Sequence, residues 1–220
     1  MLVGHYSASF AARAANRSIK LWVVVGAAQL LDILWSIFVI AGLERVEPAA
    51  GVTEGLAFVH YPWSHSLAAA AAWSLVGFVA GKLLKAGTKG SFLVAAVVLS
   101  HWFFDALVHH ADLPLWPGGG PLVGLALWNY PLAELALELV LFLAAGALLA
   151  PLWRSNGLPA WRIPAFLAFG VLFMAATRLA PPPQEVDQAV VGATGLAAYL
   201  LFVALAWAVE RPLPARAKAE

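Results

Sequence analysis

The stretch of this sequence with the clearest chemical potential is His101-Trp-Phe-Phe-Asp105-Ala-Leu-Val-His109. Its spacing of four and four residues would place His101, Asp105 and His109 on one stripe of a helix. Two imidazoles and a carboxylate on one stripe can form half of a metal site, because both groups are common ligands of divalent metals. The alternative is a buried His101–Asp105 pair that binds no metal.

Two further residues are candidates to complete such a site. Asp32 lies near the middle of the first long apolar stretch, and His65 lies at the start of the second. An ionised acid inside the hydrocarbon costs about 2.5–3.5 kcal/mol on insertion scales, so a functional reason is expected for it. For His65 the alternative is an interfacial histidine in a helix start that is capped by Ser64.

A pair of glutamates, Glu134 and Glu138, lies at the start of the fourth apolar stretch. Their spacing of four residues puts both carboxyl groups on one helical face. Either glutamate, or His109, could accept a proton from a water that a metal has activated. The alternative is a structural role, in which both carboxylates hydrogen-bond to Asn129, Tyr130 or a neighbouring helix.

The composition of the chain is strongly apolar, so polar residues within the apolar stretches need an explanation. Of the 220 residues, 62% are hydrophobic and 11% are charged, and the mean hydropathy is +0.83. Soluble domains carry about 25% charged residues, so this chain has too few charges to cover a water-exposed surface. A net charge of +1 gives no reason to expect a nucleic-acid partner. The absence of cysteine restricts a metal site to His, carboxylate and backbone ligands.

The apolar residues fall into about six stretches of membrane-spanning length. About 20 helical residues cross a bilayer core of about 30 Å. We therefore predict an all-α, polytopic membrane helix bundle that forms a single integral membrane domain over residues 1–220, without an internal repeat. The predicted spans are Leu21–Leu43, Ser64–Leu84, Ser91–Val108, Leu132–Trp153, Ile163–Leu179 and Gln188–Val209.

The distribution of Lys and Arg predicts the orientation of the bundle. Eleven of the 13 basic residues fall on one side of the predicted membrane, and Arg45 and Arg178 fall on the other. By the positive-inside rule both termini, including a tail over 211–220, are cytoplasmic. We expect the bacterial inner (plasma) membrane as the location, with the ionisable residues gathered in its outer half.

Residues 1–17 predict a short additional helix, from about His5 to Ala15, with two possible placements. The helix either re-enters the bundle beside the first span or lies as an amphipathic segment on the cytoplasmic side. In the first placement its rise of about 16 Å approaches the depth of Asp32, about 21 Å above Ser18, and His5 reaches the site. Arg13 in the middle of the helix favours the second placement, because a buried guanidinium needs a partner.

The residues that carry this chemistry resemble a known family in order and approximate spacing. Gly4-His5, Leu31-Asp32-Ile33, Trp63-Ser64-His65-Ser66-Leu67 and Ser100-His101-Trp-Phe-Phe-Asp105 are similar to motifs of the YdjM-like membrane-bound metal-dependent hydrolases. That family has an early His, a Pro-Asp-Ile-Asp stretch, a Thr-His-Ser motif and a Ser-His-x-x-x-Asp motif. The resemblance covers residues 1–117 and does not extend to the fourth apolar stretch or beyond.

The resemblance implies a metal site and hydrolysis without naming a substrate. Two departures bear on the site: the Asp32 motif has no Pro and only one Asp, and Thr-His-Ser is Ser-His-Ser around His65. Loss of the second Asp would mean one metal instead of two, or a carboxylate supplied by Glu134 or Glu138.

These observations lead to one preferred function and two alternatives. We expect a metal-dependent hydrolase in which His65, His101 and Asp105 are ligands and Asp32 and His5 are further or supporting ligands. A Cys-free His and carboxylate set suits Zn²⁺, with Mn²⁺ or Fe²⁺ as other choices. The expected partners are membrane lipid and a lipid or lipid-linked substrate at the outer interface. The alternatives are an ion- or proton-coupled transporter and a membrane scaffold with a structural His/Asp metal site.

Overall fold

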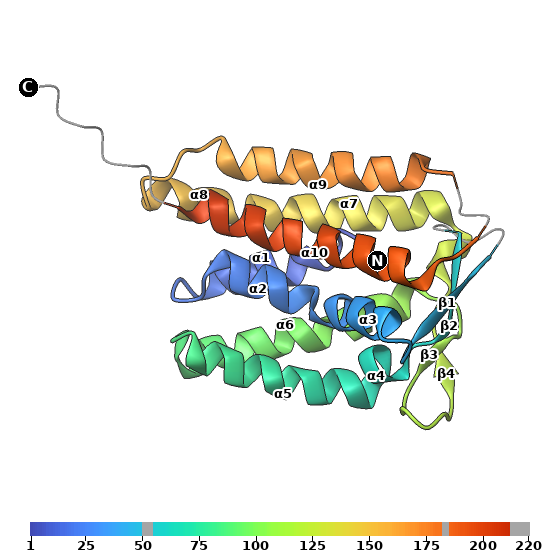
Figure 1. The fold of residues 1–220 in the computed structure, drawn as a ribbon. Helices are drawn as coiled ribbons and strands as arrows, with labels where there is room; N and C mark the ends of the chain where they lie inside the picture. The colour runs from blue at the N-terminus through green and yellow to red at the C-terminus, as the bar shows by residue number, and fades with distance from the viewer. Residues whose placement is uncertain (50–54, 182–184, 212–220) are drawn as a thin grey trace, which may run out of the picture.

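The computed structural model describes residues 1–49, 55–181 and 185–211, and over these ranges the chain is a bundle of helices (Figure 1). This confirms the predicted all-α fold class. The predicted tail over 211–220 lies outside the described residues from position 212 onward. The helices are α1 (Tyr6–Ala15), α2 (Leu21–Ala28), α3 (Leu30–Ile40), α4 (Pro62–His65), α5 (Leu67–Leu83), α6 (Gly87–Val108), α7 (Pro131–Ala147), α8 (Leu149–Ser155), α9 (Arg162–Leu179) and α10 (Gln188–Glu210), with a 3₁₀ turn η1 (Leu127–Asn129).

Each predicted apolar stretch is largely helical, but the stretches differ in their capacity to cross a membrane. Four helices are long and apolar enough to do so: α6, the α7–α8 unit over Pro131–Ser155, α9 and α10. Helices α2 and α3 provide a fifth span if the pair, bent by 54° at Gln29, counts as one. The remaining predicted stretch contains α5, which has 17 residues. By length and composition, the described residues thus provide four helices that could cross a membrane, or five if the bent pair is one span.

Local sequence signals explain where several helices begin. Pro62 and Pro131 occupy the first turn of α4 and α7, where a missing N–H breaks no helical hydrogen bond. Ser66 caps α5 by accepting a hydrogen bond from the Ala69 N–H at 3.1 Å. Asp187 caps α10 by accepting from Ala189 and Val190. Together these caps satisfy N–H groups that would otherwise lack partners.

Small residues bring α5 against α6, the helix that carries His101 and Asp105. A Cβ atom added at Gly77 would lie 2.9 Å from Val98 Cγ2, and one added at Gly81 would lie 2.8 Å from Ser91 Cα. Glycines four residues apart allow this close approach of two helices in an apolar medium.

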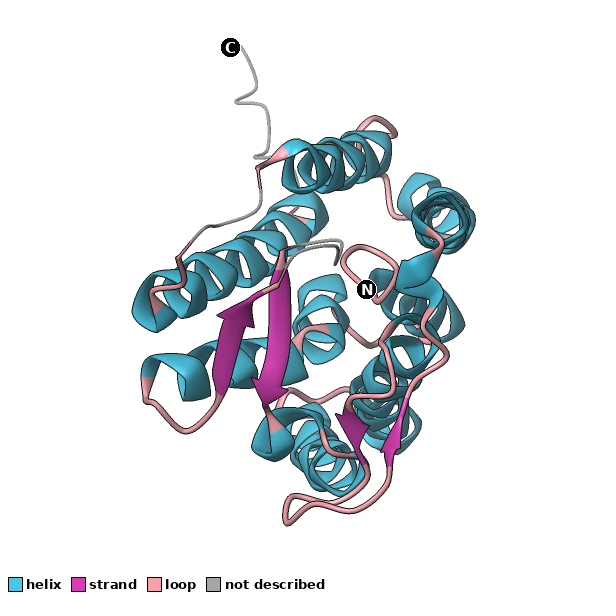
Figure 2. Cartoon of the chain, turned by 90° about the vertical axis from the view of Figure 1, so that its right-hand side faces the viewer, coloured by secondary structure: helices cyan, strands magenta, loops and turns pink. Residues whose placement is uncertain are grey.

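Two short antiparallel ribbons lie across one end of the bundle. Strand β1 (Arg45–Pro48) pairs with β2 (Leu56–His60), with Val46 opposite Phe58. Strand β3 (Leu113–Pro114) pairs with β4 (Leu122–Val123). Figure 2, viewed from this end, shows the ribbons beside the start of the chain.

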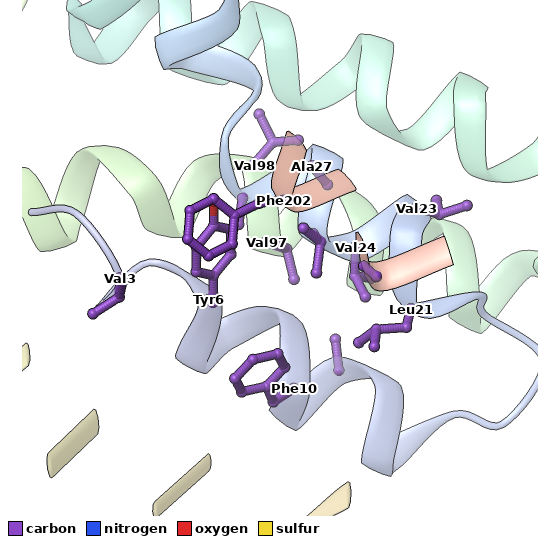
Figure 3. Packing of buried hydrophobic residues seen from close by; sticks show 14 of the residues in the cluster. Val3, Tyr6, Phe10, Leu21, Val23, Val24, Ala27, Val97, Val98 and Phe202 are labelled. Atoms are coloured by element: carbon purple, nitrogen blue, oxygen red, sulfur yellow. The ribbon is translucent and has the colours of Figure 1, made fainter. Parts of the chain in front are cut away.

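Helix α1 is an internal element of the bundle. It packs against α2, α6 and α7 (Figure 1). Its Tyr6 and Phe10 are fully buried, and Tyr6 lies 4.8 Å from the ring of Phe202 in α10 (Figure 3). Arg13 is also buried, and its Nε donates to Glu210 Oε1 at 3.0 Å. The guanidinium therefore has the partner that its burial requires.

Candidate metal site

Five polar residues predicted as metal ligands lie together in the structure, although they come from four separate segments. His101 and Asp105 lie one turn apart on α6, and Asp32 lies in the first turn of α3, directly after the bend at Gln29. His65 is the last residue of α4, and His5 immediately precedes α1. Two overlapping groups have ligand atoms within 4.8 Å of one another: His5, His101 and Asp105, and Asp32, His65 and His101.

Four ligand atoms form a compact cage. Asp105 Oδ2 lies 3.0 Å from His101 Nε2 and 3.7 Å from His65 Nε2, and Asp32 Oδ1 lies 3.6 Å and 3.4 Å from the same two nitrogens. Ligands at the usual bond length to Zn²⁺ are about 3.4 Å apart in a tetrahedron. Each of these four separations between a histidine nitrogen and a carboxylate oxygen is close to that distance, as two ligands of one divalent ion require.

The hydrogen bonding of His101 provides a separate test of this fit. Its Nδ1 lies 2.6 Å from the carbonyl oxygen of Ala28, and because a carbonyl only accepts, Nδ1 must carry the proton. In the neutral ring Nε2 then presents a lone pair to the Asp105 carboxylate. Nε2 is buried and makes no hydrogen bond, despite the 3.0 Å separation from Asp105 Oδ2. Two such acceptors need a proton between them, carried by His101 or Asp105, or a metal ion.

His65 is oriented by a chain of two residues. The hydroxyl of Ser64 lies 2.6 Å from Glu44 Oε2 and 2.7 Å from His65 Nδ1. Because the one hydroxyl proton is donated to the carboxylate, Ser64 Oγ accepts from His65 Nδ1–H, and Nε2 is left to bind a metal. Glu44 was not among the predicted site residues, since nothing in the spacing between Glu44 and Ser64 indicates that they meet.

Glu44 also anchors α4, the short helix that ends in His65. Its Oε1 accepts hydrogen bonds from the backbone N–H groups of Trp63 and Ser64, both at 2.8 Å. A carboxylate at a helix start is favourable because the free N–H groups there carry partial positive charge. Burial nevertheless raises the pKa of Glu44 above its ordinary value, although its hydrogen bonds oppose the shift.

His5 approaches the cage from the side of His101. The two imidazole rings stack with centroids 3.7 Å apart and planes within 3°. His5 Nε2 lies 3.1 Å from Asp105 Oδ1, which is also 3.0 Å from the Met1 nitrogen. Asp105 thus presents one oxygen to His5 and the other to His65 and His101.

The three residues predicted to accept a proton lie in two different places. Helix α6 ends at Val108, so His109 caps the helix instead of extending its stripe, and His109 Nδ1 lies 3.0 Å from Asp112 Oδ1. Burial lowers the pKa of His109, which favours the neutral ring. Glu138 accepts hydrogen bonds from backbone N–H groups of residues 2 and 4, and Glu134 pairs with Arg178.

A cavity of about 60 Å³ adjoins the cage. Asp32, His65, Asp105 and His109 contribute to its lining, together with aromatic residues that include Trp35 and Trp128. A water molecule occupies about 30 Å³ in the liquid, so the cavity has room for water beside the ligand atoms. The side chain of Asp32 is the most exposed of the four cage ligands, at 16%.

No family model, no curated protein and no solved structure matches this chain. The described residues place a buried His and Asp cluster that could hold a metal ion inside a bundle of apolar helices.

Proposed function

We propose that this chain is a membrane-embedded, metal-dependent hydrolase that acts on a lipid or lipid-linked substrate. The proposal agrees with the function implied by the resemblance to YdjM-like hydrolases. The observation that carries it is the set of close contacts among Asp32, His65, His101 and Asp105, with a cavity large enough for water against them.

The donor set suits a divalent cation such as Zn²⁺, with Asp32, His65, His101 and Asp105 as its ligands. When bound, such an ion activates water for attack and polarises a carbonyl or phosphoryl oxygen. Asp32 borders the cavity and is partly exposed, so movement of its carboxylate would leave room for substrate.

His109 is the residue best placed to take a proton from water in the cavity. Its Nδ1 is held by Asp112, so the neutral ring donates there and its Nε2 is the accepting nitrogen. A carboxylate that orients a histidine base in this way is a recurring arrangement in hydrolases. His109 lines the cavity, whereas Glu138 and Glu134 are engaged by other partners.

The position of the cavity favours an amphiphilic substrate. Its lining includes Leu56 and Phe58 of β2. Strand β2 belongs to the ribbons at one end of the bundle (Figure 2), so the cavity lies at that end. By the distribution of Lys and Arg this is the outer side of the inner membrane. A lipid could keep its chains in the bilayer while its head group enters from that side.

A structural metal site is the second candidate, because four protein ligands are what closed zinc sites contain. The two functions differ in whether His109 is needed. We expect purified protein to retain metal and to hydrolyse a lipid ester or phosphoester, and His109→Gln to lose turnover with its metal content unchanged. Metal in both proteins with no turnover in either, across a panel of such lipids, would favour the structural site.

A further inference from the structure

The segment before His5 is fixed by a buried carboxylate from a distant part of the chain. Glu138 of α7 accepts the backbone N–H of Leu2 with both oxygens, at 2.9 Å each, and the N–H of Gly4 with Oε2 at 2.9 Å. Glu138 is fully buried. An ionised carboxylate in such a place is stable only when donors surround it, so these bonds fix the segment strongly.

Arg178 of α9 completes this cluster. Its Nη2 lies 2.5 Å from Glu134 Oε2 and 3.6 Å from Glu138 Oε1. The guanidinium supplies the positive charge that two adjacent buried carboxylates need. We call Glu134, Glu138 and Arg178 the α7–α9 clamp.

The ring of His5 has no comparable anchor of its own. Neither of its ring nitrogens makes a hydrogen bond among the described residues, although Nε2 lies close to Asp105. The ring is placed by its stacking on His101 and by the backbone that precedes it. That backbone is the segment held by Glu138.

We propose that Glu138 is a positioning residue that sets His5 against the metal site. The inference depends on the proposed metal site. It assigns a role there to Glu138, which is not itself one of the proposed metal ligands. In this arrangement the clamp acts through His5 on Asp105 and His101, because His5 Nε2 lies 3.1 Å from Asp105 Oδ1 and its ring stacks on that of His101. Residues that hold metal ligands in place commonly change metal affinity by 10- to 100-fold when they are replaced.

The test uses Co²⁺ as the probe, because its visible spectrum reports the number and type of its ligands. We expect Glu138→Gln to change the Co²⁺ spectrum in the same direction as His5→Ala and to weaken Co²⁺ binding about 10- to 100-fold. In the double variant Glu138→Gln should add no further loss to that of His5→Ala, because both changes act through His5.

Glu210 provides a matched control. It is a carboxylate that likewise pairs with an arginine, Arg13 at 3.0 Å, and accepts a backbone N–H, that of Leu21 at 2.6 Å. Glu210→Gln should lower the thermal stability of the bundle without changing the Co²⁺ spectrum. If Glu138→Gln does not fold, Gly4→Pro removes one donor to the clamp and leaves α7 intact, and we expect the same spectral change.

Two results would overturn the inference. One is a wild-type Co²⁺ spectrum and affinity in Glu138→Gln, and the other is a full additional loss when Glu138→Gln is combined with His5→Ala. In both cases His101→Ala would still abolish binding, so the metal site itself would stand. If wild-type protein binds no Co²⁺ and His101→Ala changes nothing, the proposed function fails and the inference fails with it.

Discussion

The chain from Glu44 through Ser64 to His65 leads to a quantitative prediction for Ser64→Ala. The substitution removes the hydroxyl that lies 2.7 Å from His65 Nδ1 and 2.6 Å from Glu44 Oε2. Glu44 keeps its hydrogen bonds to two backbone N–H groups, so α4 should remain anchored. The imidazole of His65, however, loses the acceptor that fixes its tautomer and its orientation.

The magnitude follows from the kind of contact that is lost. Removing a group that orients a ligating histidine weakens metal binding by about 10- to 100-fold, which equals about 1.4–2.7 kcal/mol at 25 °C. Competition for Zn²⁺ against a chromophoric chelator measures a change of this size directly. We expect Ser64→Ala to show this loss in detergent-purified protein.

Ser66 is the control two residues away. Its hydroxyl accepts the N–H of Ala69 and caps α5, and it takes no part in the chain to His65. Ser66→Ala should cost about 1 kcal/mol of stability, the usual value of an N-cap, and leave Zn²⁺ affinity unchanged. Wild-type affinity in Ser64→Ala, or an equal loss in both variants, would refute the assigned role of the hydroxyl.

Three further predictions follow from the structure. His101→Ala and Asp105→Asn should each remove the metal measured by elemental analysis, because both residues contribute to the four-atom cage; full occupancy in both variants would leave only a buried His–Asp pair. Because burial raises the pKa of Glu44, the native state binds its proton more tightly than the unfolded chain, and the stability this provides is lost as the pH rises through the raised pKa. In thermal unfolding, the stability of the wild-type protein relative to Glu44→Gln should therefore fall as the pH rises above the ordinary range of Glu pKa values. A stability difference that stays constant with pH would count against this prediction. In intact cells an impermeant thiol reagent should label Glu47→Cys and not Lys85→Cys, and the reverse pattern would invert the orientation.

Most of the helices could be predicted from the sequence because they lie in long stretches of apolar residues, and such stretches are visible in the composition along the chain. The bend at Gln29 was not predicted, since no Pro or Gly marks it, yet it sets the start of α3 and so the position of Asp32. The spacing of His101 and Asp105 placed both on one helical face because four residues make about one turn. The same rule extended the stripe to His109, which instead caps the helix and turns to Asp112.

Interactions between distant segments lay beyond what local patterns can indicate. Glu44 reaches Ser64 across 20 residues, and Glu138 reaches Gly4 across 134. Neither pairing follows from helix periodicity, because each depends on how whole helices pack. The ligand types could be read from the sequence, whereas the groups that orient those ligands required the fold.

Both ends of helix α1 are held by residues far away in the sequence. From the sequence alone, Arg13 counted against burial of this helix, because an unpaired guanidinium inside an apolar bundle is costly. Its partner is Glu210, 197 residues later in the chain, which also accepts the N–H of Leu21 at the start of α2. At the other end Glu138 accepts the N–H groups of Leu2 and Gly4. A helix of 10 residues is thus held inside the bundle by a carboxylate at each end, the partly buried Glu210 and the fully buried Glu138. His5 lies between the helix and Gly4, which Glu138 holds.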